Sequence, residues 1–186
     1  MNADELREKL TKSIGQQQAI EAEPAAAEKA QQANVPDPRQ ARFDHEHDEG
    51  GGVTSRWTGN DDKRPAAREI GDAKEVSAAT GDPIVLYGNQ FAGVDGTIGN
   101  PPRLFQLKSA QDGPTLVRVI TEARQNAQAH GDRGLEVHVW APEMSLSQAT
   151  DALLRDPVPY QSWLGRVVVH VRGGYFVVPT SGAPSA

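Results

Sequence analysis

The chain has 186 residues, a net charge of −6 and an apolar fraction of 37%. This polar composition predicts one ordinary domain with a long polar segment, and it excludes a protein with two large cores. The sequence contains no cysteine, which excludes disulfide scaffolds, thiolate metal centres and cysteine nucleophiles.

We expect no membrane segment, because no stretch of the sequence approaches about 18 consecutive apolar residues. The beginning of the chain carries charges and glutamines where a secretory signal needs an apolar stretch, so any export would use another route. The negative net charge does not favour nucleic-acid binding through the overall field of the protein, although it permits local contacts.

Residues 1–64 read as a polar linker or N-terminal extension, because they hold few large apolar side chains. Within them, Phe43–Gly52 is an acidic run closed by three glycines, which is typical of a solvated linker. His45 and His47 alternate with acidic residues there. Mixed-charge runs usually have no ligand role, so we assign no metal site to them. Trp57 indicates a strand or an anchor onto the domain.

Residues 65–186 are predicted to form an α/β domain, because regular helix and strand signals begin at Pro65. The expected elements are a helix over 65–80, strands over 83–88, 91–99 and 103–110, a helix over 115–130, a strand over 135–142, a helix after Ser145 and a Gly-Gly hairpin over 166–179. The core order is α-β-β-β-α-β. It predicts a mixed central sheet, since three adjacent strands with tight turns pair largely antiparallel.

The candidate chemistry lies on two of these strands. Gln106 and Lys108 share one face of the strand over 103–110, because side chains two residues apart on a strand point the same way. Asp95 lies on the preceding strand, where its carboxylate can approach that lysine. Carboxylate and carbonyl oxygens suit Mg²⁺, or another divalent cation such as Mn²⁺ or Zn²⁺. A nearby ammonium can orient a water molecule or stabilise a developing phosphate charge.

Each of these residues also has a simpler interpretation. The dipeptide Asp95-Gly96 is favoured in hairpin turns, and Lys108 could be an exposed strand lysine. Taken singly, these interpretations are the stronger ones. The element order and the spacing between Asp95 and Lys108, taken together, favour a catalytic interpretation.

The helix, the Gly-Val-Asp-Gly strand and the strand with Gln106-Leu107-Lys108 resemble the PD-(D/E)XK nuclease superfamily over about residues 65–141. Gln106 stands where most members have an acid, which is similar to the Gln-X-Lys variant of the Mrr-like restriction branch, and Val94 replaces the usual proline. The resemblance implies a restriction-endonuclease-like fold and a metal-dependent endonuclease that hydrolyses phosphodiester bonds. It also implies that Glu69, Asp95 and Gln106 bind the metal and that Lys108 positions the attacking water.

Two glutamates compete for the metal-binding role on the first helix. Ile70, Ala73 and Val76 define the buried stripe of that helix. Glu69 lies at the edge of the stripe, whereas Glu75 points almost opposite. A ligand for a site at the sheet must flank the buried face, so Glu69 is preferred and Glu75 is the alternative.

The resemblance extends to the C-terminal nuclease toxin domains of bacterial polymorphic and contact-dependent toxins. It implies a DNA or tRNA substrate, a cognate immunity protein as partner, and delivery into the cytoplasm of a target bacterium. Two alternatives stay open. One is a cytoplasmic restriction or repair nuclease of the same fold. The other is a non-catalytic immunity or binding protein. This alternative stays open because a glutamine, Gln106, stands at the acid position of the motif.

The remaining histidines and arginines are less informative. His138 and His170 lie in Val-His-Val settings, where a lone histidine is more often a cross-strand or edge residue than a catalyst. Candidates for a phosphate-binding rim are Arg103, Arg118, Arg124, Arg166 and Arg172.

Overall fold

The computed structural model describes residues 37–88, 90–130, 134–156 and 164–178. Its helices are α3 (Ala67–Thr80), α4 (Gly113–His130) and α5 (Leu146–Arg155), with two short 3₁₀ turns at Pro38–Gln40 and Asp61–Lys63. Its strands are β1 (His45–Gly50), β2 (Val53–Trp57), β3 (Ile84–Leu86), β4 (Gly96–Ile98), β5 (Arg103–Ser109), β6 (Leu135–Ala141), β7 (Leu164–Val171) and β8 (Gly174–Val178).

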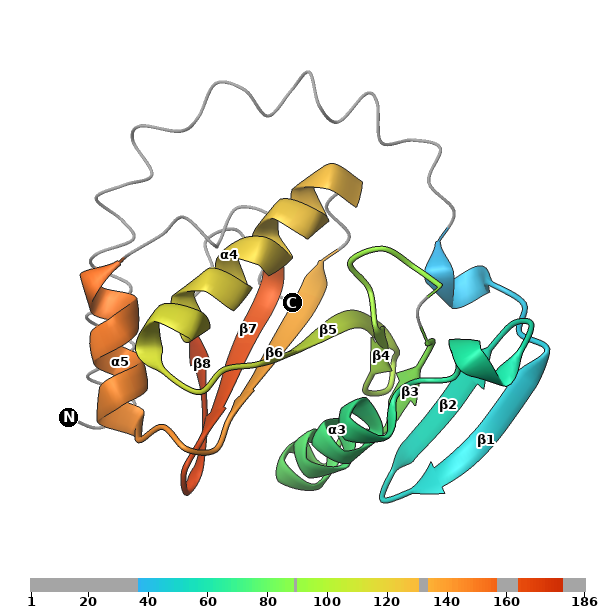
Figure 1. Cartoon of the computed structure of the whole chain (residues 1–186), viewed down its shortest axis with the longest axis horizontal. Helices are drawn as coiled ribbons and strands as arrows, with labels where there is room; N and C mark the ends of the chain where they lie inside the picture. The colour runs from blue at the N-terminus through green and yellow to red at the C-terminus, as the bar shows by residue number, and fades with distance from the viewer. Residues whose placement is uncertain (1–36, 89, 131–133, 157–163, 179–186) are drawn as a thin grey trace.

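The strands form one eight-stranded mixed sheet, and their order in the sheet is their order in the chain. The pairs β2–β3, β5–β6 and β6–β7 are parallel, and the other neighbouring pairs are antiparallel. Each parallel pair is connected through one helix (Figure 1). The predicted α/β architecture with a mixed sheet is therefore confirmed.

Helices cover opposite faces of the two halves of the sheet. On the half formed by β5 to β8, α4 and α5 pack over a core that includes Leu104, Val137, Val169 and Phe176. On the other half, α3 packs its buried stripe against the opposite face, in a second core that includes Ile84 and Phe105. Phe105 and Leu104 are neighbours on β5, so this strand contributes to both cores.

The expectation of a solvated linker over Phe43–Gly52 is wrong, because most of this segment is a strand. β1 pairs with β2, and β2 joins the sheet through β3, so the described fold begins well before Pro65. Every residue of β1 except Glu49 is exposed, which is why its sequence lacks the apolar alternation of a buried strand. Burial is supplied instead by β2, whose residues Val53, Ser55 and Trp57 face inward.

Gly96 has a structural role that the sequence did not indicate. It is not part of a hairpin turn but begins β4, directly after Asp95. A Cβ atom at this position would collide with the backbone carbonyl of Val85 on β3, so only glycine allows the two strands to approach this closely. The Asp-Gly pair therefore fixes Asp95 at the end of a buried strand.

The predicted polar extension lies mainly in residues 1–36, which are outside the described part of the chain, as is Pro179 at the end of the predicted hairpin. None of the described helices has the length and apolar character needed to cross a membrane.

Candidate active site

Asp95 is held against β5 by backbone hydrogen bonds. Its N–H donates to the Phe105 carbonyl at 3.0 Å, and its carboxylate Oδ2 accepts from the Leu107 N–H at 2.7 Å. In the antiparallel register, Gly96 pairs with Phe105 and Thr97 with Leu104. Continuing that register by one residue sets Asp95 opposite Gln106.

Gln106 and Lys108 lie on the face of β5 that carries Leu104, which is the face toward α4. Gln106 is buried, with 3% of its surface exposed, whereas Lys108 is half-buried. The side-chain oxygen Oε1 of Gln106 has no hydrogen-bond partner among the described residues. A buried oxygen without a donor is costly, so Gln106 offers an acceptor at this position that no described residue uses.

Glu69, in the first turn of α3, lies within electrostatic range of Asp95. Burial raises the pKa of Glu69 to about 7, and the negative charges of Asp95 and Asp72 contribute further, against a hydrogen bond from the Ala66 backbone. α3 approaches from the opposite face of the sheet. Asp95 immediately precedes the first residue of β4, so a side chain from either face of the sheet can approach it.

Asp95 is itself surrounded closely by protein, and burial raises its pKa. The hydrogen bond from the Leu107 N–H and the positive charge of Lys108 oppose that rise in the pKa of Asp95. Asp95 is therefore coupled electrostatically to Glu69 and, separately, to Lys108, and it lies opposite Gln106 in the continued sheet register. These are the four residues singled out from the sequence.

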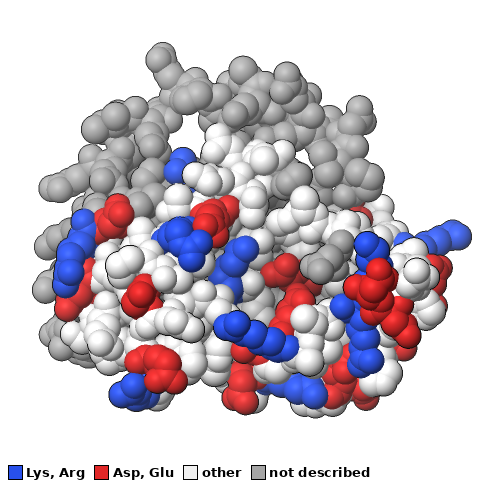
Figure 2. Space-filling model, in the orientation of Figure 1, with Lys and Arg blue, Asp and Glu red and all other residues white. Residues whose placement is uncertain are grey.

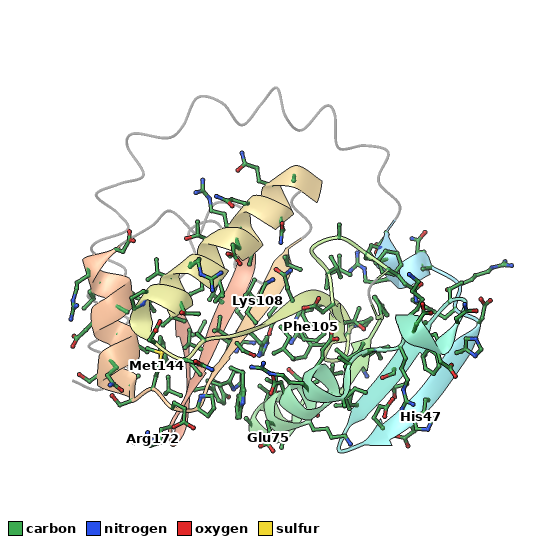
Figure 3. All side chains as sticks on the ribbon, viewed as in Figure 1. His47, Glu75, Phe105, Lys108, Met144 and Arg172 are labelled. Atoms are coloured by element: carbon green, nitrogen blue, oxygen red, sulfur yellow. The ribbon has the colours of Figure 1, made fainter. Side chains whose placement is uncertain are left out.

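Glu75, the alternative helix residue, is exposed on α3 and lies away from β5 (Figure 3). A carboxylate that the sequence analysis missed is Asp72, which accepts a hydrogen bond from the Ser109 hydroxyl at 3.0 Å. This bond connects α3 to β5, because Asp72 lies about one helical turn after Glu69 and Ser109 directly follows Lys108. The periodicity of α3 alone could have flagged it, because Asp72 lies three residues after Glu69.

The donor set suits a hard divalent cation, because two carboxylates and an amide oxygen are ligands that Mg²⁺ accepts. The unpartnered Gln106 Oε1 and the like charges of Glu69 and Asp95 fit such an ion. Histidine does not contribute. Within the described ranges, no three His, Cys, Asp or Glu side chains gather as a metal-binding group.

The five arginines proposed as a phosphate-binding rim do not form one surface. Arg103 and Arg166 contact Glu136 on one face of the sheet, whereas Arg118 lies on α4 over the other face and pairs with Glu122. The remaining two are Arg124, whose Nε is buried, and Arg172, which lies near Glu143. Figure 2 shows both charge signs interspersed over the visible face, without a continuous basic patch.

A second polar cluster, which the sequence analysis did not predict, is buried on β6 and β7. Glu136 Oε1 lies 2.7 Å from Nε2 of His138, and Nδ1 of His138 lies 2.9 Å from Nε2 of His170. The other carboxylate oxygen of Glu136 accepts from Arg103 Nε at 2.7 Å. All three members of this Glu-His-His cluster are at most 2% exposed, which makes each histidine a cross-strand residue of the core.

We expect this cluster to make the fold sensitive to acid. Burial lowers the pKa of His170 from 6.5 to about 3, helped by the nearby charges of His138 and Arg166. The unfolded chain therefore binds a proton that the folded chain rejects, and stability present above pH 6.5 is lost as the pH falls toward 3. For Glu136, burial alone would raise the pKa, but hydrogen bonds from His138 and Arg103 lower it to about 2. Its contribution is lost as the pH falls below 4.5.

Glu69 acts in the opposite direction, because its raised pKa adds stability as the pH falls from about 7 to 4.5. Asp95, whose pKa burial also raises, acts in the same direction as Glu69. The net loss of folding stability is therefore expected mainly at the acid end of this pH range. Urea unfolding at neutral pH and at about pH 4 measures the loss in the double variant Glu69→Gln, Asp95→Asn, which removes both opposing contributions. Equal unfolding free energies for this variant at both pH values would contradict the prediction.

Comparisons with protein-family models, with curated proteins and with solved structures found no match to this chain.

Proposed function

We propose that this protein is a metal-dependent nuclease that hydrolyses phosphodiester bonds of DNA or tRNA. The observation that carries the proposal is the position of Asp95, which the Leu107 N–H holds opposite the unpartnered oxygen of Gln106 and which is coupled to both Glu69 and Lys108. Two carboxylates next to one ammonium, at the end of a buried strand, suit the hydrolysis of a charged ester.

The arrangement of the chain supports the same proposal. The order α3-β3-β4-β5-α4-β6, with three antiparallel strands followed by a parallel one, is the core order expected for the PD-(D/E)XK superfamily. Fold order is a weaker argument than the site, because one fold can carry many activities. The positions of Glu69 on the first helix and Lys108 on the third strand of this unit add the specific support.

In the proposed reaction Glu69, Asp95 and Gln106 would hold a divalent cation such as Mg²⁺. The cation, when bound, supplies positive charge that stabilises the phosphate as it gains negative charge. Lys108 orients a water molecule and donates to the phosphate oxygens. The water oxygen gives up one proton to the solvent as it forms a bond to phosphorus, the ester P–O bond breaks, and the leaving oxygen takes up one proton, so that one water molecule is added across the bond. The hydrogen bond from Leu107 N–H keeps Asp95 in position throughout.

The biological setting that we propose is a toxic effector domain of a bacterial competition system. In this setting the domain is delivered into the cytoplasm of a target bacterium, and the producing cell protects itself with a cognate immunity protein. The polar composition of residues 1–64 is compatible with a connector to a delivery module.

The test is cleavage of plasmid DNA and of total tRNA by the purified protein, with Mg²⁺ and with EDTA. We expect cleavage of at least one substrate with Mg²⁺, no cleavage with EDTA, and loss of cleavage in Lys108→Ala. Lys63→Ala is the matched control, because Lys63 is exposed on a 3₁₀ turn and is not among the site residues. Cleavage that survives in Lys108→Ala would refute the assigned site, and no cleavage of either substrate would favour a binding protein.

A further inference from the structure

One hydrogen bond joins a side chain of α3 to a side chain of β5. The Ser109 hydroxyl donates to Oδ2 of Asp72 at 3.0 Å, although the two residues are 37 positions apart in the chain. Both residues are half-buried. Ser109 lies on the face of β5 that carries Phe105, which packs against α3. The bond is therefore on the α3 face of the sheet, opposite to the face that carries Lys108.

This bond gives a direction to packing that is otherwise mainly apolar. The buried residues Ile70, Ala73 and Val76 of α3 belong to the second core. Hydrophobic packing of this kind has no preferred direction, whereas a hydrogen bond weakens steeply when its length or angle changes. Within the part of the chain that the structure describes, the bond from Ser109 to Asp72 is the one hydrogen bond between a side chain of α3 and a strand.

The position of Glu69 follows the position of α3. Asp72 lies three residues after Glu69, which is about 4.5 Å along the helix, and side chains at this spacing are neighbours. Glu69 is coupled electrostatically to Asp72 as well as to Asp95. The Glu69 carboxylate also accepts a hydrogen bond from the backbone of Ala66, at the start of the same helix. Its side chain is thereby held relative to α3.

The position of Asp95 follows the position of β5, because the N–H of Leu107 on this strand donates to its carboxylate. Ser109 lies two residues after Leu107, which is about 6.6 Å along the strand. Glu69 is thus carried by α3, and Asp95 is held by β5. The bond between Ser109 and Asp72 joins these two elements close to both carboxylates, so it influences how far apart they lie.

The contacts of Asp72 indicate a supporting role. Its Oδ2 accepts from Ser109 and also lies 4.0 Å from Nε of Arg68, a distance that is too long for a hydrogen bond but favourable for the charges. Among the described residues, Asp72 does not complete a group of three metal-binding carboxylates with Glu69 and Asp95. Asp72 therefore lies beside the candidate metal site and not within it.

We propose that Asp72 and Ser109 are positioning residues of the candidate active site, and that their hydrogen bond holds the Glu69 carboxylate at the distance from Asp95 that a divalent cation requires. The proposal rests on the proposed nuclease function, in which both carboxylates bind the cation. Neither Asp72 nor Ser109 is assigned a contact with the substrate. Loss of a supporting partner of a metal site typically costs about 10- to 100-fold in metal affinity or activity.

Binding of Mg²⁺ to the full chain, measured by titration calorimetry without nucleic acid, tests the proposal. Ser109→Ala and Asp72→Ala each remove the bond, and we expect each to weaken Mg²⁺ binding about 10-fold. Asp72→Asn is the matched control, because its amide oxygen still accepts from the Ser109 hydroxyl although the charge is lost. We expect it to retain the affinity within about 3-fold, since a charge near the surface acts weakly through solvent. The double variant Asp72→Ala, Ser109→Ala should bind no more weakly than either single variant, because both changes remove the same bond.

Cleavage provides a second measurement. At a fixed Mg²⁺ concentration, Ser109→Ala is expected to lower kcat and to leave KM for the nucleic acid unchanged, because the bond is not part of the substrate-binding surface. When Glu69 is already replaced in Glu69→Gln, adding Ser109→Ala is expected to cause no further loss, since its effect acts through Glu69.

Equal Mg²⁺ affinity in the wild-type chain, Asp72→Asn and Asp72→Ala would overturn the positioning role, even if urea unfolding showed that Asp72→Ala is less stable. Binding by Asp72→Asn that is as weak as binding by Asp72→Ala would assign the effect to the charge of Asp72 and would also overturn it. Equal cleavage by the wild-type chain and Ser109→Ala would refute the positioning role and leave the nuclease standing.

The calorimetry also separates this proposal from the proposed function. A wild-type chain that binds Mg²⁺ but cleaves neither DNA nor tRNA would refute the nuclease, and the comparison of Asp72→Ala with Asp72→Asn would still decide the positioning role. A wild-type chain that binds no Mg²⁺ would overturn both proposals.

Discussion

Replacement of Asp95 by asparagine is expected to lower metal-dependent cleavage about 100- to 1,000-fold, the usual cost of removing one preorganised charge from an active site. Asparagine has nearly the same shape and retains a carbonyl oxygen that can accept from the Leu107 N–H, so the strand end is expected to keep its structure. Cleavage rates at several Mg²⁺ concentrations measure the effect, and the concentration for half-maximal activity is expected to rise.

The Asp95→Asn substitution is not expected to lower the stability of the folded state. Burial raises the pKa of Asp95, so its charge is held at a cost in the free protein, and the neutral variant is expected to unfold at the same or a higher urea concentration. Asp62→Asn, on an exposed 3₁₀ turn, is the matched control for both measurements. A variant that loses activity together with stability would indicate a structural rather than a catalytic role.

Two variants of α3 test the other carboxylate in the same assay. Glu69→Gln is expected to impair cleavage, whereas Glu75→Gln, on the exposed side of the same helix, is expected to leave it unchanged. The pair shares the helix, the residue type and the substitution, so it separates position from chemistry. The reverse result would make Glu75 the functional glutamate.

The second large effect is expected from Glu136→Ala, which should lower the free energy of unfolding by about 3 kcal/mol or more. The change leaves His138 without its acceptor and leaves Arg103 with only its contact to Asp82 at 3.1 Å. The cost falls on the buried His138, because a buried polar group that loses its hydrogen-bond partner is more destabilising than the intact network is stabilising. Urea unfolding at neutral pH measures the difference.

Glu143→Ala is the control for this variant. Glu143 is 78% exposed and lies 3.9 Å from Arg172, so its loss is expected to change the stability by no more than about 0.5 kcal/mol. Glu136→Gln retains an acceptor for His138 and should fall between the two. If Glu136→Ala were as stable as Glu143→Ala, the buried cluster would contribute nothing to the fold.

Local signals explain why the helices were predictable. Pro65 and Gly81 bracket α3, and Gly81 adopts the left-handed conformation that favours glycine after a helix. Ser145 begins α5 with a capping box that it forms with Gln148, and its hydroxyl accepts from the Gln148 N–H. These signals are encoded within a few residues, so the sequence reveals them without knowledge of the tertiary structure.

Features that depend on distant pairing were not predictable. The strand β1 has no apolar face of its own, and only its pairing with β2 orders it. The Glu-His-His cluster requires the parallel register in which Trp140 pairs with His170, and that register joins residues 30 positions apart. The alternation of Glu136, His138 and Trp140 on one face of β6 was visible in the sequence, but their partners on β7 were not.

The candidate site was predictable only in part. The alternation on β5 was sufficient to put Gln106 and Lys108 on one face, and helical periodicity was sufficient to rank Glu69 above Glu75. The approach of Glu69 and Asp95 from opposite faces of the sheet was not visible, because it depends on how far β4 extends. Asp95-Gly96 looked like a turn, and its place at a strand end follows from the close contact of Gly96 with Val85.

The order of the strands has a consequence for folding during synthesis and for transport of the chain. Each of the eight described strands pairs only with strands next to it in sequence, so none has to insert between two that are already paired. A strand that leaves the ribosome finds the edge of the sheet already formed, and folding can follow synthesis in one direction. In the proposed delivery to another cell, the sheet could be unzipped from one end for passage through a narrow channel and reassembled in the same order.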